Sequence, residues 1–434
     1  MVLRVIVSLT ILFSCLFANA QANEERAKQL LDFCMVGQGD SVYVRLNDNV
    51  RSNLTPAVFN QIFLGLEQQV GKYQSHSEWK TELVNNMKIY YTDLQFENLA
   101  LRFLTAFDDD GLANTIRFMP VPAKPTAKAE LLNTEEIEEK EIEIISGQLK
   151  LPGILSLPKG VTRPPVAILV HGSGPNDRDE TIGPNKPFRD LAYGLAKQGI
   201  AVVRYDKRTY VYKDVELASD FDKETVDDAL AIIEMMKNEP LIDSNRIYIV
   251  GHSQGALLAP RIAERSRNAL AGIILIAGPA RSMEDLMVEQ TIYLSSLAPS
   301  TPETEKQVEA IKQQAINVKK IGREPFDEKN GLILEVPISY WKFANEYRPV
   351  EVAKKLKLPM LIVQGERDYQ VTMEDFNLWK AGLAKAKYVS FKSYSKLNHL
   401  LQEGIGKSTP TEYNVQTPVA EYLISDIANW IKEN

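Results

Sequence analysis

Short apolar runs alternate with helix-like stretches through the last two thirds of the 434-residue chain, and this alternation restricts the fold more than any other feature of the sequence. Strands that are apolar throughout are buried on both faces, which is typical of a parallel sheet covered by helices on both sides. The expected strands lie at residues 140–145, 153–157, 166–170, 201–205, 247–250, 272–277, 360–364 and 388–394. The sequence therefore predicts a doubly wound α/β domain with a mostly parallel sheet over residues 140–434.

Residues 281–350 break this alternation by adding helical material between two expected strands. An apolar stripe recurs there at three- and four-residue steps. The stripe consists of Val308, Ile311, Ala315 and Val318. Three interpretations remain open for this insertion: a surface helix packed on the domain, a lid over the active-site edge, or a basic helix on a membrane surface. If the insertion is a lid, Tyr340 and Trp341 belong to the wall of a modest substrate pocket.

The first part of the chain has a different pattern, which indicates a separate domain at residues 24–118. Helical spacing at residues 25–35 and 57–73 precedes strand-like runs. Two helices followed by a short meander predict a small α+β domain. The order of these elements resembles that of small domains of nuclear-transport-factor-like (NTF2-like) or cystatin-like shape. Residues 119–139 are rich in proline, alanine and charge, and we interpret them as a linker.

Residues 1–20 have the pattern of a secretory signal peptide. An apolar run follows Arg4 and ends at Ala18-Asn19-Ala20, a small-x-small cleavage pattern. The sequence thus predicts an exported protein, periplasmic or secreted. Cys15 lies in a segment that faintly resembles a lipoprotein cleavage box, so a lipid anchor is the less favoured alternative. No later run is long and apolar enough to span a bilayer, so we expect no stable membrane insertion.

Composition excludes some classes of partner. The net charge is −7, and no basic stripe with interleaved aromatic residues is present, so we expect no nucleic-acid partner. Once a signal peptide is removed, Cys34 is the remaining cysteine, and a disulfide framework is excluded. His/Cys/carboxylate spacing typical of a metal site is absent, so we expect neither a metal nor another cofactor. The sequence does not determine the oligomeric state.

The stretch IYIVGHSQGALLAP at residues 247–260 carries the strongest chemical signal. A buried strand, a Gly-x-Ser-x-Gly turn and a helix make up a nucleophile elbow, in which a sharp turn exposes a serine above the edge of the sheet. Gly251 and Gly255 provide the small residues that so tight a turn demands. Ser253 is therefore the candidate nucleophile.

A serine hydroxyl needs a base, and the chain has four histidines. His76 lies in the other domain, His171 belongs to a loop after a strand, and the side chain of His252 leaves the elbow in a different direction from that of Ser253. His399, in a loop after the last strand, is the candidate base.

An acid must orient the base, and it is expected after a strand that lies between the serine and the histidine in the chain. Asp368 ends the segment PMLIVQGERD and is favoured over its neighbour Glu366. Two backbone N–H groups are expected to form an oxyanion hole: that of Gln254, directly after the nucleophile, and one from the loop HGSG, at Ser173.

Six charged residues follow two expected strands at the same edge, and we interpret them as ion pairs that brace the loops, with substrate contact as the alternative. They are Asp177, Arg178, Asp179, Asp206, Lys207 and Arg208.

The order of HGSGPNDRDETIGPNKPFRDLA, VVRYDKR, GHSQG, QGERDYQV and NHLL resembles that of bacterial α/β-hydrolases of the dienelactone-hydrolase and prolyl-oligopeptidase-like group, many of which are esterases. The resemblance covers residues 140–434 and implies an α/β-hydrolase fold with a Ser-Asp-His triad. Two departures matter for the activity. Ala256 stands where peptidases of the group usually carry a third glycine, and Ser253 stands where dienelactone hydrolases carry a cysteine.

The combined hypothesis is an exported serine carboxylesterase that acts on a small-molecule ester through an acyl-enzyme intermediate. A peptidase or thioesterase with the same triad is one alternative, and a non-catalytic binding protein on the hydrolase fold is another.

Overall fold

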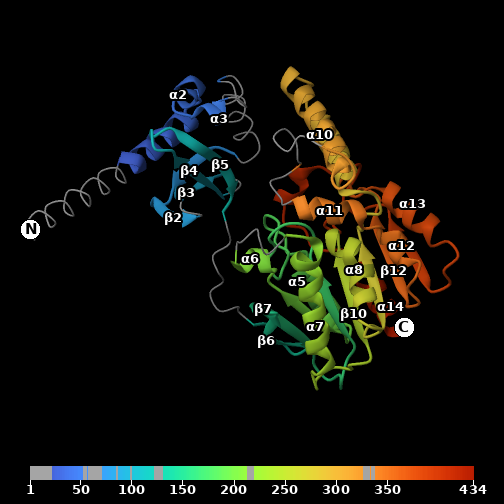
Figure 1. Cartoon of the computed structure of the whole chain (residues 1–434). Helices are drawn as coiled ribbons and strands as arrows, with labels where there is room; N and C mark the ends of the chain where they lie inside the picture. The colour runs from blue at the N-terminus through green and yellow to red at the C-terminus, as the bar shows by residue number, and fades with distance from the viewer. Residues whose placement is uncertain are drawn as a thin grey trace, which may run out of the picture. The chain divides into compact units, whose positions relative to one another are not determined.

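A computed structural model describes most of the chain, and it divides the chain into two compact units, Met1–Ala127 and Lys128–Asn434 (Figure 1). The described residues are 22–51, 56, 71–84, 87–97, 100–121, 131–212, 219–325, 333 and 338–434. The expected signal peptide at residues 1–20, most of the expected helix at 57–73 and the middle of the expected linker lie outside them.

The N-terminal unit confirms the predicted small α+β domain. Residues 22–35 are helical and precede a five-stranded antiparallel sheet in the order β1-β3-β4-β5, with β2 paired to β3. Its elements are α2 (Gly39–Tyr43), α3 (Asp48–Arg51), β1 (Tyr73–His76), β2 (Lys80–Val84), β3 (Met87–Phe96), β4 (Ala100–Phe107) and β5 (Ala113–Pro120). Leu30, Cys34 and Phe103 lie fully buried in one core, because the apolar faces of the helix and the sheet meet there.

The second unit is built on an eight-stranded sheet in the order β13-β12-β11-β10-β8-β9-β7-β6. The strands from β8 to β13 run parallel, while β6 and β7 form an antiparallel edge. The strands are β6 (Ile137–Ser146), β7 (Leu149–Pro158), β8 (Val166–Val170), β9 (Ala201–Tyr205), β10 (Ile247–His252), β11 (Gly272–Ile276), β12 (Met360–Gly365) and β13 (Val389–Tyr394). The predicted α/β class with a mostly parallel sheet is thus confirmed.

Helices cover both faces of this sheet. In β10, Ile249 packs into the core on the side of α7 and α8, and the next residue, Val250, packs into the core on the side of α5 and α14. The longer helices are α5 (Pro187–Lys197), α7 (Asp227–Lys237), α8 (Gln254–Arg265), α9 (Met283–Ser295), α10 (Pro302–Lys320), α11 (Ile338–Glu346), α13 (Met373–Gly382) and α14 (Glu421–Glu433). Shorter turns are α6 (Arg208–Tyr212), η2 (Asp222–Val226), α12 (Pro349–Ala353) and η4 (Pro410–Asn414). This two-sided cover explains why the strand sequences are continuously apolar.

The insertion at residues 281–350 contains α9, α10, α11 and the start of α12. The N-terminal part of α10 projects from the body of the unit (Figure 1) and begins with a capping box at Thr301. Near its other end, Ala315 and Val318 of the predicted stripe are buried in the same core as Trp341. This end of α10 therefore behaves as a helix packed on the domain. Among the described residues, no helix combines the length and apolar character needed to cross a membrane.

The structure moves both ends of the expected linker at 119–139. β5 ends at Pro120 and β6 begins at Ile137, so each overlaps the predicted range. Residues before β6 also pair with it: the Leu132 and Glu139 backbones are hydrogen bonded, and Asn133 forms a bridge with Glu138. The second unit therefore begins before residue 140. The sequence placed this boundary too late because the start of β6 is charged and alternating, which is also typical of a polar linker.

Candidate active site

Ser253 stands at a sharp turn between β10 and α8. Its backbone has φ 51° and ψ −114°, a left-handed conformation that non-glycine residues rarely adopt. A side chain at Gly251 would collide with the backbone of Gly255, and one at Gly255 would collide with the backbones of Val170 and His171. Both predicted elbow glycines are therefore required by close backbone approach, and the turn holds Ser253 partly exposed between buried neighbours.

The structure brings His399 and Asp368 together although they are 31 residues apart. His399 Nδ1 lies 2.7 Å from Asp368 Oδ2, and both residues are at least 96% buried. Since a carboxylate can only accept, Nδ1 donates and Nε2 is left to accept a proton. Glu366, the rival acid, is exposed and instead accepts a hydrogen bond from Ser393.

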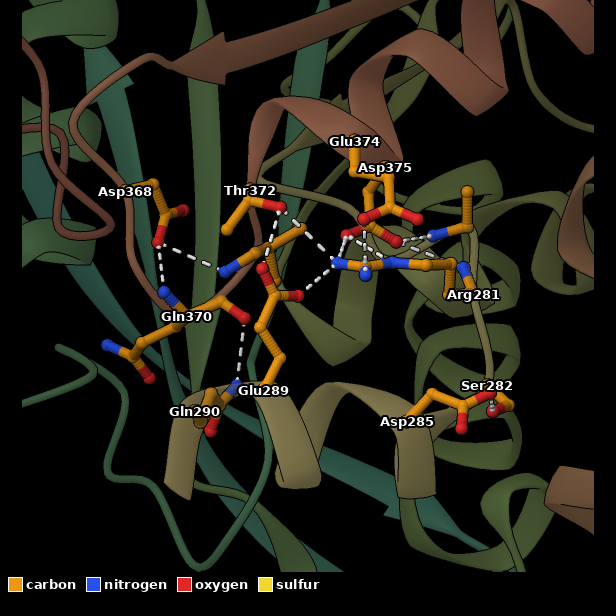
Figure 2. Close-up of polar contacts among 12 residues, drawn as sticks. Arg281, Ser282, Asp285, Glu289, Gln290, Asp368, Gln370, Thr372, Glu374 and Asp375 are labelled. Carbon is orange, nitrogen blue, oxygen red and sulfur yellow. Dashed lines mark hydrogen bonds and ion pairs between the residues drawn. The ribbon is translucent and has the colours of Figure 1, made fainter. Parts of the chain in front are cut away.

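Asp368 is fixed in its orientation by its own loop. Its Oδ1 accepts hydrogen bonds from the backbone N–H groups of Gln370 at 2.8 Å and Val371 at 3.1 Å (Figure 2), and Gln364 Nε2 donates to Oδ2 at 3.2 Å. The carboxylate is thus held by three donors besides His399, and it presents one defined oxygen to the imidazole.

A cavity of about 220 Å³ opens over the elbow, and Ser253 and His399 both line it. The polar lining comes mainly from the loops after β8 and β10, and apolar residues complete the cavity. The apolar lining consists of Ile182, Leu257, Pro279, Met283, Leu286, Met287 and Val371. Three of these belong to α9, so the first helix of the insertion contributes much of the apolar lining.

Tyr340 and Trp341 do not line this cavity, which corrects the expectation that they wall the pocket. Trp341 is fully buried in the domain core, and its indole N–H donates to the carbonyl of Ile333 at 3.0 Å. The Tyr340 hydroxyl accepts a hydrogen bond from Gln254 Nε2 at 2.6 Å, beneath the elbow. The aromatic rings of α11 pack in the interior of the domain. The cavity wall that was expected to contain them is formed in part by the flexible side chains of α9.

The α9 wall is fastened by Arg281, directly before the helix. Its guanidinium lies between two segments, bonded to Asp375 at 2.8 Å and to Glu289 at 2.6 Å (Figure 2). On the same wall, Gln290 Nε2 donates to the carbonyl of Gln370 at 2.8 Å, beside the Asp368 loop. These contacts tie α9 to the segment that carries Asp368, the candidate acid. Sequence reasoning did not single out Arg281, because its partners lie 8 and 94 residues away.

The loop after β8 is held by two buried charged residues: Lys207, which the sequence predicted to brace the loops, and Glu180, which sequence reasoning did not single out. Glu180 Oε1 accepts from the Gly172 N–H at 2.6 Å, and the Lys207 ammonium donates to the Gly172 carbonyl at 3.0 Å. Ser173, the predicted oxyanion donor, follows directly and lines the cavity. Gln254, the other predicted donor, is the first residue of α8, where a backbone N–H has no partner within its own helix.

His252 forms a second histidine–carboxylate pair at the cavity, with Glu180. Its Nδ1 lies 2.9 Å from Glu180 Oε2, and its Nε2 donates to the backbone carbonyl of His399 at 2.9 Å. Burial lowers the pKa of His252, but Glu180 and the His399 carbonyl outweigh it, so the pKa is raised. Burial likewise raises the pKa of Glu180, and the charge of His252 outweighs it, so that pKa is lowered. The pair therefore favours its charged form.

His171 is excluded as a base by its surroundings. It is fully buried between the rings of Phe188 and Tyr205, with both centroids 4.9 Å away. Burial lowers its pKa to about 4, so it stays neutral at ordinary pH.

The six charged residues singled out near this edge brace the loops. Arg178 makes a bidentate contact with Asp206 at 2.9 and 2.7 Å, and Arg208 pairs with Asp228 in the same way. Each of these four side chains is at most 10% exposed. The cavity lining includes none of the six, so loop bracing, not substrate contact, is the interpretation that the structure supports. Across the part of the chain that the structure describes, no group of three or more histidine, cysteine or carboxylate side chains could hold a metal ion.

Comparisons with known proteins agree with this architecture. Residues 185–403, half of the chain, match the family described as serine aminopeptidase, S33 (Hydrolase_4), and residues 27–112 match a family of proteins of unknown function (DUF3887). The chain is 36% identical to Esterase EstD of Thermotoga maritima over 387 residues, which cover 89% of each protein.

Two solved structures are also similar. Est1E from Butyrivibrio proteoclasticus is 18% identical with a TM-score of 0.45, over 68% of this chain and 99% of that one. The esterase domain of a Rhodothermus marinus protein is 14% identical with a TM-score of 0.42, over 68% and 98%. The family match and the extended identity to EstD show that the chain belongs to the S33 (Hydrolase_4) family of α/β-hydrolases, with a DUF3887 domain before its hydrolase domain.

Proposed function

We propose that this hydrolase cleaves carboxylic esters through Ser253, His399 and Asp368. The observation that carries the proposal is the 2.7 Å contact between His399 Nδ1 and Asp368 Oδ2, in a cavity that Ser253 also lines. The imidazole keeps Nε2 as an acceptor, and the elbow keeps the serine hydroxyl exposed at the same cavity. A serine becomes a nucleophile when such a base takes its proton, and the cavity shared by Ser253 and His399 supports this role for the pair.

The proposed reaction has two halves. Ser253 Oγ attacks the carbonyl carbon while His399 takes the hydroxyl proton, and the carbonyl oxygen becomes an oxyanion bound by the backbone N–H groups of Ser173 and Gln254. Collapse breaks the ester bond, and His399 gives its proton to the leaving alcohol. In the second half, water attacks the acyl-serine in the same way and releases the carboxylic acid. Asp368 holds the imidazole in position and stabilises its charged form in both halves.

An ester is favoured over a peptide for two reasons. EstD, with which the chain shares 36% identity over most of its length, is named an esterase. In addition, Ala256 replaces the third glycine that the resembling peptidases usually carry. The family description names an aminopeptidase, so peptide substrates form the comparison that tests the proposal.

The size of the cavity indicates a short acyl group. Its volume of about 220 Å³ is small for a ligand pocket. Met283, Leu286 and Met287 of α9 line the cavity, and an uncharged acyl chain would replace water beside them. We therefore expect acetate to butyrate esters to be turned over faster than octanoate esters.

The test compares p-nitrophenyl acetate, butyrate and octanoate with aminoacyl anilides, together with a fluorophosphonate label. We expect hydrolysis of the short esters, slower hydrolysis of the octanoate, and labelling that Ser253→Ala abolishes. Faster hydrolysis of the anilides would replace the esterase proposal with a peptidase. An unlabelled wild-type protein without activity on any ester would favour a binding protein on the hydrolase fold.

We also propose that the protein is exported, on the strength of the apolar run and the Ala18-Asn19-Ala20 pattern. Intact-mass measurement of the protein from a secreting bacterial host should show a mature chain that begins at Gln21. A full-length chain retained in the cytoplasm would contradict this proposal. A lipid-modified Cys15 would support export through the lipoprotein route instead.

A further inference from the structure

The peptide group between Gly172 and Ser173 carries one of the two proposed oxyanion donors. Its N–H belongs to Ser173 and its carbonyl belongs to Gly172. The peptide bond is planar and trans, so the two groups point in opposite directions. Whatever binds the Gly172 carbonyl therefore determines the direction of the Ser173 N–H.

Lys207 binds that carbonyl from beneath the loop. Its Nζ lies 3.0 Å from Gly172 O, its side chain is 1% exposed, and it is not part of the cavity lining. Ser173, by contrast, lines the cavity. Asn176 Nδ2 also donates to Gly172 O, at 3.2 Å, so two donors hold this carbonyl, and Lys207 is the charged and buried one. The Ser173 N–H points away from the carbonyl that these two donors fix.

The same ammonium holds the residue that carries the second donor. Lys207 Nζ donates to Gln254 Oε1 at 3.1 Å and to Glu224 Oε1 at 2.7 Å. Gln254 is further fixed through its Nε2, which donates to Tyr340 at 2.6 Å and to Glu224 at 3.1 Å. An ammonium has three protons, and here the three acceptors are a carbonyl of the oxyanion loop, the first residue of α8 and one carboxylate.

We infer that Lys207 is a positioning residue that sets both backbone donors of the oxyanion hole at once. One cation connects the loop after β8 to the start of α8, and its charge also polarises the Gly172–Ser173 peptide, which makes the Ser173 N–H a stronger donor. Lys207 does not touch the substrate. The inference rests on the proposed ester hydrolysis. It gives a role in that reaction to Lys207, which is not a member of the proposed triad.

A purely structural ion pair would predict something different, and the neighbouring residue offers a matched control. Arg208 is equally buried in an ion pair, with Asp228, and its side-chain contacts are to Asp228 and Ser146 rather than to the oxyanion loop or Gln254. Removing either pair should destabilise the fold, but removing only the Lys207 pair should disturb the oxyanion donors.

The experiment uses two full-length double variants that leave no buried charge unpaired, Lys207→Met/Glu224→Gln and the control Arg208→Met/Asp228→Asn. Each is assayed with 4-nitrophenyl acetate and with the thionoester in which sulfur replaces the carbonyl oxygen, because an oxyanion hole favours oxygen over sulfur. Urea unfolding reports how much each variant is destabilised. If a double variant does not fold, the conservative Lys207→Arg enzyme is assayed in the same way, since a longer, forked cation cannot place one proton on each of the three acceptors.

For the Lys207 variant we expect kcat on the oxygen ester to fall by about 10²-fold, with a much smaller change in KM. The ratio of oxygen-ester to thionoester rates should fall by about tenfold or more, and the Arg208 control should keep the wild-type ratio. Equal losses on both substrates, or a wild-type ratio in the Lys207 variant of an active enzyme, would overturn this inference alone. A wild-type protein inactive on all esters would overturn both proposals.

Discussion

The polar lining and the apolar lining of the cavity differ in the interactions that hold them in place. The polar side rests on buried charges: Glu180 with His252, and Lys207 with Glu224, each pair 6% exposed or less. The apolar lining includes the α9 side, whose Met283 and Met287 are half-buried, flexible and uncharged. A buried ion pair tolerates little displacement, because a partner that moves away leaves an uncompensated charge. We therefore expect the polar side to determine the rate of the reaction and the α9 side to determine which esters react.

The largest effect should come from the triad itself. Ser253→Ala and His399→Ala should each lower turnover of p-nitrophenyl acetate by at least ~10³-fold, because members of a triad act as a unit. Initial rates together with circular dichroism separate lost chemistry from lost folding. His76→Ala is the matched control, since His76 is an exposed histidine of the other unit and should leave the rate unchanged. Near-normal turnover in His399→Ala would mean that the base has been wrongly assigned.

The second largest effect concerns stability and comes from Glu180→Gln. Breaking a buried ion pair by removing one charge costs about 3 kcal/mol. The amide oxygen can still accept from the Gly172 N–H, so the loop keeps its backbone contact. Urea unfolding of the wild type and the variant measures the difference, and Glu234→Gln, which changes an exposed carboxylate, is the control.

The pH dependence of that difference follows from the two pKa shifts. His252 has a raised pKa, so its contribution is complete below the ordinary value of 6.5 and is lost as pH rises through the raised pKa. Glu180 has a lowered pKa, so its contribution is complete above the ordinary value of 4.5 and is lost as pH falls through the lowered pKa. The stability difference between wild type and Glu180→Gln should therefore be greatest between pH 4.5 and 6.5 and smaller in alkali. A difference that grows steadily toward high pH would show that the pair is not ionised in the folded protein.

A smaller effect, on selectivity, should follow from the α9 wall. Met287→Ala enlarges the cavity, so the octanoate-to-butyrate rate ratio should rise by about tenfold, with little loss of stability. Trp341→Phe should lower the free energy of unfolding by roughly 2 kcal/mol and keep the wild-type octanoate-to-butyrate ratio. The reason is that Trp341 is buried away from the cavity and donates a hydrogen bond to Ile333. Chain-length profiles and urea midpoints of both variants provide the test. A changed chain-length profile in Trp341→Phe would show that Trp341 contributes to the substrate pocket after all.

The parts of the candidate site that could be inferred from the sequence depend on local backbone geometry. Gly251 and Gly255 are required by contacts around one turn, and Asp368 follows from its place after a strand, so a short window was enough for each. Lys207 was predicted to brace the loops, but its partners Gly172, Glu224 and Gln254 could not be named, and Glu180 was not singled out, because their partners lie in other segments of the chain. Aromatic residues are common in pockets, so Trp341 was expected in the wall. Nothing in the local pattern of α11 distinguishes a ring that faces a cavity from one that packs on a core.

Removing the N-terminal unit should have the smallest effect on the rate of hydrolysis. The residue at which the fragment begins should affect its stability more than the loss of the unit affects its rate. Every residue that lines the cavity belongs to Lys128–Asn434, so a fragment of residues 128–434 should hydrolyse p-nitrophenyl acetate at the full-length rate. A fragment of residues 140–434 keeps the same cavity but loses Glu139, which pairs with Arg204, a guanidinium whose side chain is 2% exposed.

Arg204 would retain Asp179 as a partner. However, β6 would also lose its first three residues, and one of them, Ile137, is fully buried. We expect the shorter fragment to unfold at lower urea, by about 3 kcal/mol, with an unchanged rate per folded molecule. Active-site titration with a fluorophosphonate counts the folded molecules in each preparation. If the 128–434 fragment is folded and fully labelled but slow on p-nitrophenyl acetate, the N-terminal unit contributes to catalysis, and the division of labour between the two sides of the cavity would have to include it.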